Sequence, residues 1–195
     1  MSQFPKARFL VSAAAAAQFV PDRGVEVAFV GRSNAGKSSA INTIVNRRQF
    51  ARTSKTPGRT QLVNFFELSE DRRLVDLPGY GFARVSDAMR QSWERLIGSY
   101  FESRSCIGGL FLIVDIRRGL NDGDLQILAL AEAYGLPVHI LLSKADKLKR
   151  GQAATALQAA RREVGDRASV QLFSALKRTG VDEARATLNR CLEGV

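Results

Sequence analysis

Apolar and polar positions along the chain predict strands and helices that follow one another in turn. Short apolar runs rich in β-branched residues predict buried strands, at residues 25–31, 62–68, 72–76, 109–115, 138–142 and 169–173. Apolar residues at helical spacing between these runs predict helices, at residues 37–46, 87–104, 123–134, 151–164 and 180–192. This alternation is typical of a three-layer α/β domain with helices on both faces of the sheet. We therefore predict one domain over residues 25–195, built on a mainly parallel six-stranded sheet.

Four of these elements can be described more closely. Only residues 69–71 separate the second and third predicted strands, so the two strands should form a hairpin and give the sheet one antiparallel edge strand. The helix predicted after Ser86 has the clearest apolar stripe, which core packing explains better than a cofactor surface. The single histidine, His139, lies within an apolar run, and we interpret it as a packed core residue rather than a general base.

The first predicted strand leads into Gly31-Arg-Ser-Asn-Ala-Gly-Lys-Ser38, which fits the phosphate-binding P-loop pattern G-x-x-x-x-G-K-[ST]. Gly31 and Gly36 allow backbone amides to close around phosphate oxygens. Lys37 adds a cation for the β- and γ-phosphates, and the Ser38 hydroxyl is a ligand for Mg²⁺. A strand before the loop and a helix after it are the context that this motif requires. The candidate nucleotide ligands are Gly31, Arg32, Ser33, Asn34, Ala35, Gly36, Lys37 and Ser38.

A second motif, Asp76-Leu-Pro-Gly79, ends another predicted strand. Asp76 is placed to hold Mg²⁺ through a water molecule, and the amide of Gly79 can reach a γ-phosphate because glycine has no side chain. Pro-Gly is also typical of an ordinary turn, but its position after a strand favours a nucleotide site. The candidate ligands here are Asp76, Leu77, Pro78 and Gly79.

Two further motifs point to the base. Ser143-Lys-Ala-Asp146 follows the strand at 138–142. The Asp146 carboxylate can accept two hydrogen bonds from guanine N1–H and its exocyclic amine, which adenine cannot supply, while the Lys144 stem can lie along the base. A solvated turn is the alternative. Small residues after the last strand resemble the loop whose amides reach guanine O6. The candidate base ligands are Ser143, Lys144, Ala145, Asp146, Phe173, Ser174 and Ala175.

In this order, the motifs resemble those of the translation-factor-related GTPases. Thr56-Pro-Gly-Arg-Thr-Gln61 and Asp76-Leu-Pro-Gly-Tyr-Gly-Phe-Ala83 narrow the resemblance to the EngB (YihA/YsxC) family of bacterial GTPases. The resemblance implies a P-loop GTPase domain that binds GTP or GDP with Mg²⁺, assists assembly of the large ribosomal subunit, and is needed for normal division and septation. Position 143 is Ser where GTPases at large have Asn, so nucleotide affinity is expected to be modest.

Residues 47–61 predict a long loop that would form the first switch. Its candidate nucleotide ligands are Gly58, Arg59, Thr60, Gln61 and Leu62. Thr60 would ligate Mg²⁺ and contact the γ-phosphate only when GTP is bound. Thr56 is a rival in the same loop, and the family position favours Thr60. Gly79 and the loop to Arg84 would form the second switch, which relaxes after hydrolysis.

Hydrolysis is expected to be slow. Many GTPases orient the attacking water with a Gln directly after Asp-x-x-Gly, whereas this chain has Tyr80. The side-chain carbonyl of Asn34 offers a second means of catalysis, because a K⁺ ion held there would add positive charge near the transition state. The alternative is that Asn34 only shapes the loop. The candidate catalytic residues are Lys37, Thr60, Gly79 and Asn34.

The net charge of +10 and the isoelectric point near 10.3 predict an acidic polymer as partner. Seven Lys or Arg and no acid fall within residues 27–66: Arg32, Lys37, Arg47, Arg48, Arg52, Lys55 and Arg59. The C-terminal half adds Lys147, Lys149, Arg150, Arg161, Arg162, Lys177 and Arg178. We expect ribosomal RNA or a precursor of the large subunit, without readout of DNA sequence. A generally basic surface is the alternative to a nucleic-acid site.

Three function classes remain open: an assembly GTPase, a P-loop small-molecule kinase, and a nucleotide-binding interaction module without rRNA contact.

The chain lacks an apolar run long enough to span a membrane, and Cys106 and Cys191 make no disulfide or zinc pattern. Basic residues ahead of the apolar residues 9–20 would permit a secretory signal. We favour an N-terminal arm or helix over residues 1–24 that packs on the domain of a monomeric cytoplasmic protein, because GTP is found in the cytoplasm.

Overall fold

The computed structural model describes residues 4–51, 61–81 and 86–194. Within these residues the strands are β1 (Arg8–Ala13), β2 (Val25–Gly31), β3 (Val63–Ser69), β4 (Arg72–Asp76), β5 (Ile107–Asp115), β6 (Val138–Ser143) and β7 (Ser169–Leu172). The α-helices are α1 (Lys37–Val45), α2 (Asp87–Ser103), α3 (Asp122–Ala133), α4 (Arg150–Val164) and α5 (Val181–Glu193). Each strand and helix expected from the sequence is present, with its ends shifted by no more than two residues.

The strands form one sheet in the order β1-β3-β4-β2-β5-β6-β7. β3 runs antiparallel to both of its neighbours, while the pairs β2–β4, β2–β5, β5–β6 and β6–β7 are parallel. The prediction of a mainly parallel sheet is confirmed. The prediction of six strands is wrong, because the sheet has seven. The added strand is β1 at the edge, so the antiparallel strand β3 lies one place in from the edge.

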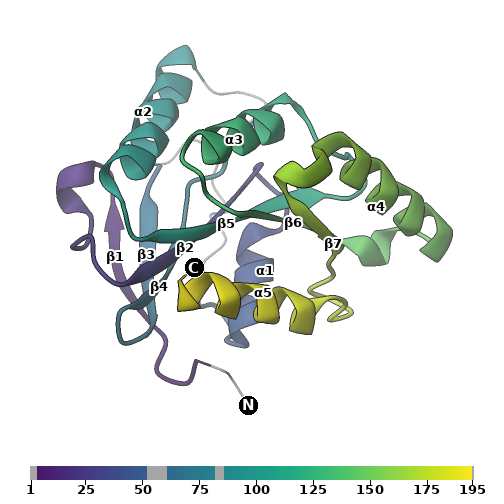
Figure 1. The fold of residues 1–195 in the computed structure, drawn as a ribbon, viewed down its shortest axis with the longest axis horizontal. Coiled ribbons are helices and arrows are strands. Elements are labelled where there is room, and N and C mark those ends of the chain that lie inside the picture. The colour runs from purple at the N-terminus through teal and green to yellow at the C-terminus, as the bar shows by residue number, and fades with distance from the viewer. Residues whose placement is uncertain (1–3, 52–60, 82–85, 195) are drawn as a thin grey trace.

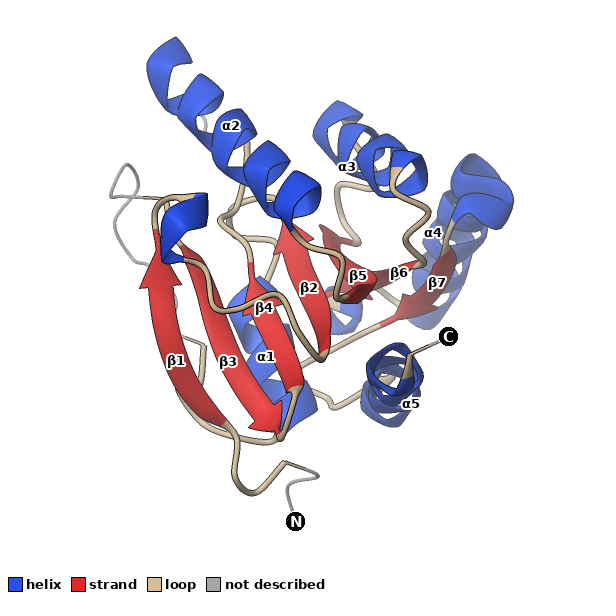
Figure 2. Cartoon of the chain, turned by 60° about the vertical axis from the view of Figure 1, so that its left-hand side comes forward, coloured by secondary structure: helices blue, strands red, loops and turns tan. Residues whose placement is uncertain are grey.

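The seventh strand, β1, lies in the segment that we expected to be an arm or a helix. It pairs with β3 at the outer edge of the sheet, as Figure 2 shows. Most of its residues are at least partly exposed, so the strict alternation of a half-buried strand is missing from its sequence. The register of the pair shifts between Phe9 and Val11, an irregularity common at sheet edges.

Helices cover both faces of the sheet, as the α/β prediction requires (Figure 1). Successive residues of a strand point to opposite faces, so Val27 and Phe29 of β2 pack in the core beneath α1 and α5, while Ala28 and Val30 pack in the core beneath α2, α3 and α4. The stripe predicted on α2 is confirmed as core at its C-terminal half. Within the described residues, no helix has the length and apolar character needed to cross a membrane.

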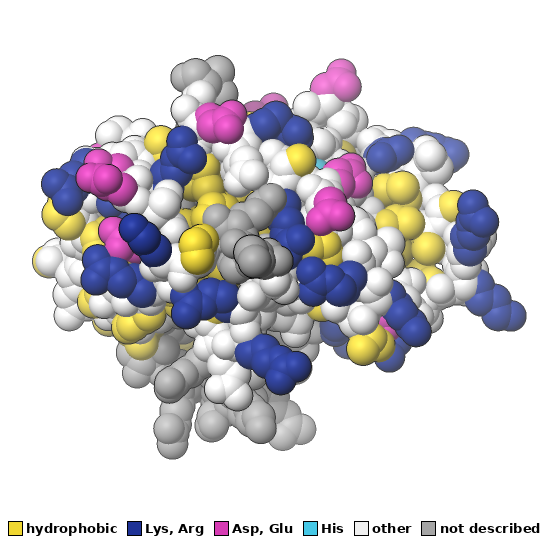
Figure 3. Space-filling model, turned by 90° about the horizontal axis from the view of Figure 1, so that it is seen from below, with side chains coloured by type: hydrophobic (Ala, Val, Ile, Leu, Met, Phe, Trp, Pro, Cys, Tyr) yellow, Lys and Arg dark blue, Asp and Glu magenta, His cyan; other side chains and the backbone are white. Residues whose placement is uncertain are grey.

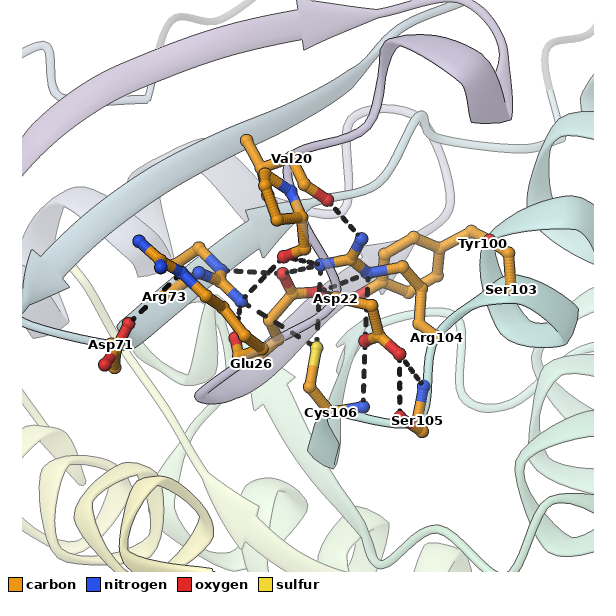
Figure 4. Close-up of polar contacts among 12 residues, drawn as sticks. Val20, Asp22, Glu26, Asp71, Arg73, Tyr100, Ser103, Arg104, Ser105 and Cys106 are labelled. Atoms are coloured by element: carbon orange, nitrogen blue, oxygen red, sulfur yellow. Dashed lines mark hydrogen bonds and ion pairs between the residues drawn. The ribbon is translucent and has the colours of Figure 1, made fainter.

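A buried cluster of charged residues holds the segment before β2 against the amino ends of the strands (Figure 4). The Glu26 carboxylate is fully buried and accepts hydrogen bonds from Arg73 Nε at 2.7 Å and Arg104 Nε at 3.1 Å. Arg104 also donates to the backbone oxygen of Val20 at 2.5 Å. Because removing one partner would leave a buried charge uncompensated, this cluster fixes the chain that links β1 to β2. It lies at the end of the sheet opposite to the sequence motifs.

Candidate nucleotide-binding site

The sequence motifs meet at one edge of the sheet. The parallel strands β2, β4, β6 and β7 end at Gly31, Asp76, Ser143 and Leu172, and each motif begins where its strand ends. The carboxyl ends of parallel strands lie at a common edge, which is where ligands bind in α/β sheets. The structure thus brings together the P-loop, the Asp76–Gly79 turn and the two predicted base-binding segments.

The P-loop has the backbone that phosphate binding needs. A side chain at Gly31 would place its Cβ 2.5 Å from the backbone oxygen of Ile113, so only glycine fits there. Gly36 has a φ of 100° and precedes the first residue of α1, whose N-terminus has no side-chain cap. Uncapped amides at a helix N-terminus attract anions. The Ser33 hydroxyl is buried and has no hydrogen-bond partner among the described residues. An unpaired buried hydroxyl costs free energy, and a hydrogen bond to a phosphate oxygen would remove that cost.

Lys37 and Asp76 form an ion pair inside the site. Lys37 Nζ contacts Asp76 Oδ1, and the two side chains are only 13% and 6% exposed. The cation predicted for the phosphates is therefore paired with the carboxylate predicted for the metal. A nucleotide with its Mg²⁺ would supply a new partner to each of these two side chains. Phosphate oxygens suit Lys37, and a metal-bound water suits Asp76.

The donors near this pair fit Mg²⁺. Ser38 follows Lys37 in the first turn of α1 and offers a hydroxyl oxygen, and Asp76 offers carboxylate oxygens. Mg²⁺ prefers oxygen ligands and is usually held by one or two protein groups together with phosphates and water. Among the residues that the structure describes, no three or more His, Cys, Asp or Glu gather as metal ligands. A fully protein-built metal centre is thus not found in this part of the chain.

The turn after Asp76 is tied to both the P-loop and the neighbouring helices. Ser33 N–H donates to the backbone oxygen of Tyr80 at 2.8 Å, and Trp93 Nε1 donates to that of Pro78 at 2.8 Å. The Tyr80 ring packs edge-on against Trp93, with centroids 5.6 Å apart. Its hydroxyl donates to Asp124 Oδ1 at the start of α3. The residue that replaces the usual Gln is therefore held by α3.

Burial sets the protonation of this Tyr80–Asp124 pair. Desolvation, together with the Asp124 charge, raises the pKa of Tyr80 well above its ordinary value, so the phenol stays protonated near neutral pH. Desolvation also raises the pKa of Asp124, although the hydrogen bond from Tyr80 opposes that shift. Asp124 was not among the predicted site residues. Its sequence signal is the capping box that it forms with Asn121, which predicts a helix start and nothing about the site.

The predicted base-binding segment at the end of β6 is fastened to the P-loop. Lys144 Nζ donates to the backbone oxygen of Asn34 at 2.5 Å and pairs with Asp115 Oδ2 at 2.9 Å. The Ser143 hydroxyl lies 2.5 Å from the backbone oxygen of Ala35 and 3.1 Å from that of Val114. These contacts fix the predicted base-binding segment against the loop that would hold the phosphates.

Asp115 is a further site residue that the sequence analysis missed. Arg117 donates to its carboxylate through Nε at 2.9 Å, and Lys144 contributes a second cation. Burial opposes ionisation of Asp115, but the hydrogen bonds from Arg117 and Lys144 outweigh it and hold its pKa well below the ordinary value. Asp115 is the last residue of a buried strand, and this position at the ligand-binding edge is the signal that could have found it.

Asp146 and the loop after β7 meet as predicted. Ser174 Oγ donates to Asp146 Oδ1 at 2.6 Å, and Ala145 N–H donates to the backbone oxygen of Phe173 at 3.1 Å. The hydrogen bond from Ser174 holds the pKa of Asp146 below its ordinary value, so the carboxylate is ionised at neutral pH. An ionised carboxylate held in place at a strand end is suited to accept two N–H donors from a guanine base.

Comparison with known proteins identifies the family. The model of the 50S ribosome-binding GTPase family matches residues 26–144. The chain is 48% identical over 190 residues to the probable GTP-binding protein EngB of Coxiella burnetii, covering 96% of this chain and 93% of that protein. It is 52% identical over 194 residues to the corresponding protein of Nitrosococcus oceani, covering 98% and 97%. This chain belongs to the EngB family of GTP-binding proteins.

The fold agrees with this assignment. A crystal structure of a probable GTP-binding protein EngB superposes on this EngB-family chain with a TM-score of 0.66 and 19% sequence identity, covering 87% of this chain and 99% of the other. At this identity the match shows the P-loop GTPase fold. The predicted family and fold class are both confirmed.

Part of the predicted site lies outside the described residues. Gly58, Arg59 and Thr60 belong to residues 52–60, as does the rival Thr56, and their roles stay predictions. Gln61 and Leu62 are half-buried and lead into β3. A cavity of about 490 Å³ is lined by P-loop residues, Asn34 among them, and by Asp115, Arg117 and Lys144. That volume is within the range of small-ligand pockets.

Proposed function

We propose that this EngB-family protein is a GTP-controlled switch that hydrolyses GTP slowly and acts in assembly of the large ribosomal subunit. The observation that carries the nucleotide part is the ionised Asp146 carboxylate, held by Ser174 beside a P-loop to which Lys144 is bonded. Guanine presents two N–H donors to such a carboxylate, whereas adenine presents none in that arrangement. A site built to satisfy those donors rejects a base that lacks them.

On the phosphate side, Lys37 exchanges Asp76 for the β- and γ-phosphates. The Ser38 hydroxyl and, through a water molecule, Asp76 would hold Mg²⁺, which would neutralise charge on the phosphates. Gly79 donates its amide to the γ-phosphate, and Thr60 is its predicted counterpart in the first switch. Loss of the γ-phosphate on hydrolysis removes both contacts, so the two loops change state with the nucleotide.

Slow hydrolysis follows from the position of Tyr80. Its hydroxyl is committed to Asp124 at the start of α3, so the residue after Gly79 does not orient a water molecule on the γ-phosphate. A K⁺ ion near Asn34 is our proposed source of additional positive charge. GTPase rates measured in equal concentrations of potassium and sodium salts test this role, and equal rates would reject it.

Ribosomal RNA of the large subunit is the partner that best fits the charge. The chain carries a net charge of +10, and the matching family is described as ribosome-binding. We place the protein in the cytoplasm as a monomer, where its loss is expected to disturb division and septation through defective large subunits. A small-molecule kinase and a binding module without rRNA contact are the competing functions.

A competition experiment separates these functions. Labelled GTP bound to the purified protein with Mg²⁺ is displaced by unlabelled GTP, GDP or ATP, and released phosphate is measured in parallel. We expect ATP to compete at least about a hundredfold more weakly than GTP, because the site would leave Asp146 without its donors. Equal competition by ATP would favour the kinase and overturn the proposal. Guanine-selective binding with no phosphate release over hours would leave a binding module without hydrolysis.

A further inference from the structure

Positive charge gathers in two parts of the chain, residues 27–66 and the segment that follows the predicted base end of the nucleotide site. Residues 147–181 contain eight Lys or Arg and two acidic residues, which gives this segment a net charge of +6. Five of these cations lie in the two connections that follow β6 and β7 or at the first residue of α4. We call them the guanine-side rim, which consists of Lys147, Lys149, Arg150, Lys177 and Arg178.

The rim is exposed and largely uncompensated. All five of its residues are exposed. Lys147 lies 3.7 Å from Asp146, and no ion pair with a described residue is found for the other four. By contrast, Arg73 and Arg104 at the opposite end of the sheet are paired with buried Glu26. Clustered like charges repel one another, so intramolecular contacts do not account for the rim.

The two halves of the rim are held together by the site itself. Ser174 Oγ donates to Asp146 and accepts the backbone N–H of Lys177 at 3.0 Å. Ser174 N–H donates to the backbone oxygen of Thr179 at 3.0 Å, which closes the turn that carries Lys177 and Arg178. The cations after β7 therefore sit on a bonded turn beside those after β6. Figure 3 shows dark-blue Lys and Arg side chains at its right-hand end, the side on which α4 lies in Figure 1, with few acidic side chains among them.

We infer that the guanine-side rim is the surface that docks on the phosphate backbone of ribosomal RNA. This inference rests on the proposed function and assigns the partner to one face of the protein. Cations on two separate loops can follow phosphates along a nucleic-acid strand. An anionic membrane would require an apolar face beside the charges. The exposed positions of α4 carry no large apolar residue, and Leu176, 72% exposed, is the one large apolar side chain exposed in the two connections.

A pair of charge-matched variants tests the rim. Lys149→Glu with Lys177→Glu reverses one cation in each half. Arg72→Glu with Arg95→Glu makes the same change in net charge at two exposed cations of β4 and α2, outside the rim and without ion pairs among the described residues. Affinity for labelled large-subunit rRNA is measured as a function of salt, together with affinity for GDP and thermal unfolding.

We expect the rim variant to lose about tenfold or more in rRNA affinity at 0.15 M salt, and its salt slope to fall by about two. The control variant should lose less than about threefold in rRNA affinity. That loss measures the effect of the changed net charge alone, which both variants share. Unchanged GDP affinity in both variants shows that they fold. Equal losses of rRNA affinity in the two variants would overturn the inference that the rim is the docking surface. The proposal that the protein is a GTPase that binds rRNA would stand.

Two other outcomes also decide the inference. Wild-type protein that binds GDP but no rRNA at low salt would overturn both the rim and the rRNA part of the proposed function, while the nucleotide part would stand. Binding to vesicles of phosphatidylserine and phosphatidylcholine, in place of rRNA and lost in the rim variant, would assign the rim to a membrane surface and overturn the inference.

Discussion

The base side and the phosphate side of the site differ in how complete they are. On the base side Ser143, Lys144, Asp115, Asp146 and Ser174 all have partners at hydrogen-bond distance within the protein. On the phosphate side the Ser33 hydroxyl has no partner among the described residues, and Lys37 is paired with the residue predicted to hold the metal. One side is already arranged for its ligand, and the other must exchange partners when a ligand arrives.

This difference matches the two tasks of the proposed nucleotide switch. A preorganised base site gives affinity for GTP and GDP alike, because no contacts are broken when the base enters. A phosphate side that exchanges partners can respond to the number of phosphates, since a ligand shifts an equilibrium only through differential contacts. Lys37→Ala and Asp146→Asn separate the two sides, and Tyr80→Phe and the titration of His139 refine the comparison.

Lys37→Ala should have the largest effect. The substitution removes the cation from the phosphates and also leaves the buried Asp76 without its partner, so we expect GTP affinity to fall more than about a hundredfold. Fluorescent GTP and GDP titrations measure the effect. Lys149→Ala, which removes an exposed lysine, is the matched control and should change affinity less than about twofold. Similar losses in both variants would mean that Lys37 does not bind phosphate.

Asp146→Asn should exchange the base that the site selects. An amide donor at this position meets the 2-carbonyl of xanthine and repels the N–H donors of guanine, so affinity should move from guanosine to xanthosine nucleotides by about a hundredfold. Ser174→Ala keeps the carboxylate and removes only its 2.6 Å hydrogen bond, so the loss of guanosine affinity should be about tenfold or less, without a gain for xanthosine. If Asp146→Asn weakens both nucleotides equally, the carboxylate does not read the base.

The fold could largely be predicted from the sequence, because its buried strands and its helices have clear patterns of apolar residues. The buried parallel strands are continuous apolar runs, and the P-loop and Asp146 motifs fall at strand ends where topology brings them together. β1 escaped prediction because an exposed edge strand lacks the alternation of a half-buried one. Its pairing depends on β3, which lies some fifty residues further along the chain.

The contacts that tie the site together were not accessible in this way. Asp115 and Asp124 matter through Lys144 and Tyr80, which approach them from distant parts of the chain. No local pattern specifies such a pairing, because each partner is an ordinary polar residue in its own segment. A motif therefore predicts which residues meet the ligand, and the structure is needed to show which residues hold them in place.

Tyr80→Phe should have an intermediate effect, confined to the phosphate side. Asp124 loses a buried donor, so we expect the free energy of unfolding to fall by about 1–2 kcal/mol. GDP affinity should stay within about twofold, because the base side is untouched, while the preference for GTP over GDP should fall. Trp93, the single tryptophan, packs on Tyr80 and reports the turn by its fluorescence. The control is Tyr134→Phe, which removes the hydroxyl of a tyrosine that is 43% exposed and should leave that signal unchanged.

The smallest effect is expected from His139, which lies on β6 beneath the base side. Its ring nitrogens lie 2.6 Å from Ser169 Oγ and 2.7 Å from Gln171 Oε1 on β7. Burial lowers the pKa of His139, although the hydrogen bond to Gln171 opposes the shift. Below about pH 6.5 the unfolded chain then binds a proton that the folded protein excludes. The free energy of unfolding should therefore fall as pH drops through this range, by up to about 1.4 kcal/mol per pH unit.

Guanine affinity should behave differently over the same range. The pKa of Asp146 lies below its ordinary value because Ser174 donates to it, so the carboxylate predicted to bind the base stays ionised from pH 7 to pH 5.5. Chemical denaturation and GDP titrations at each pH compare the two quantities. His139→Gln should remove the slope of stability with pH and keep GDP binding. A slope that persists in this variant would assign the titration to other groups, and a parallel loss of GDP affinity would show that the base side is not the preorganised half of the site.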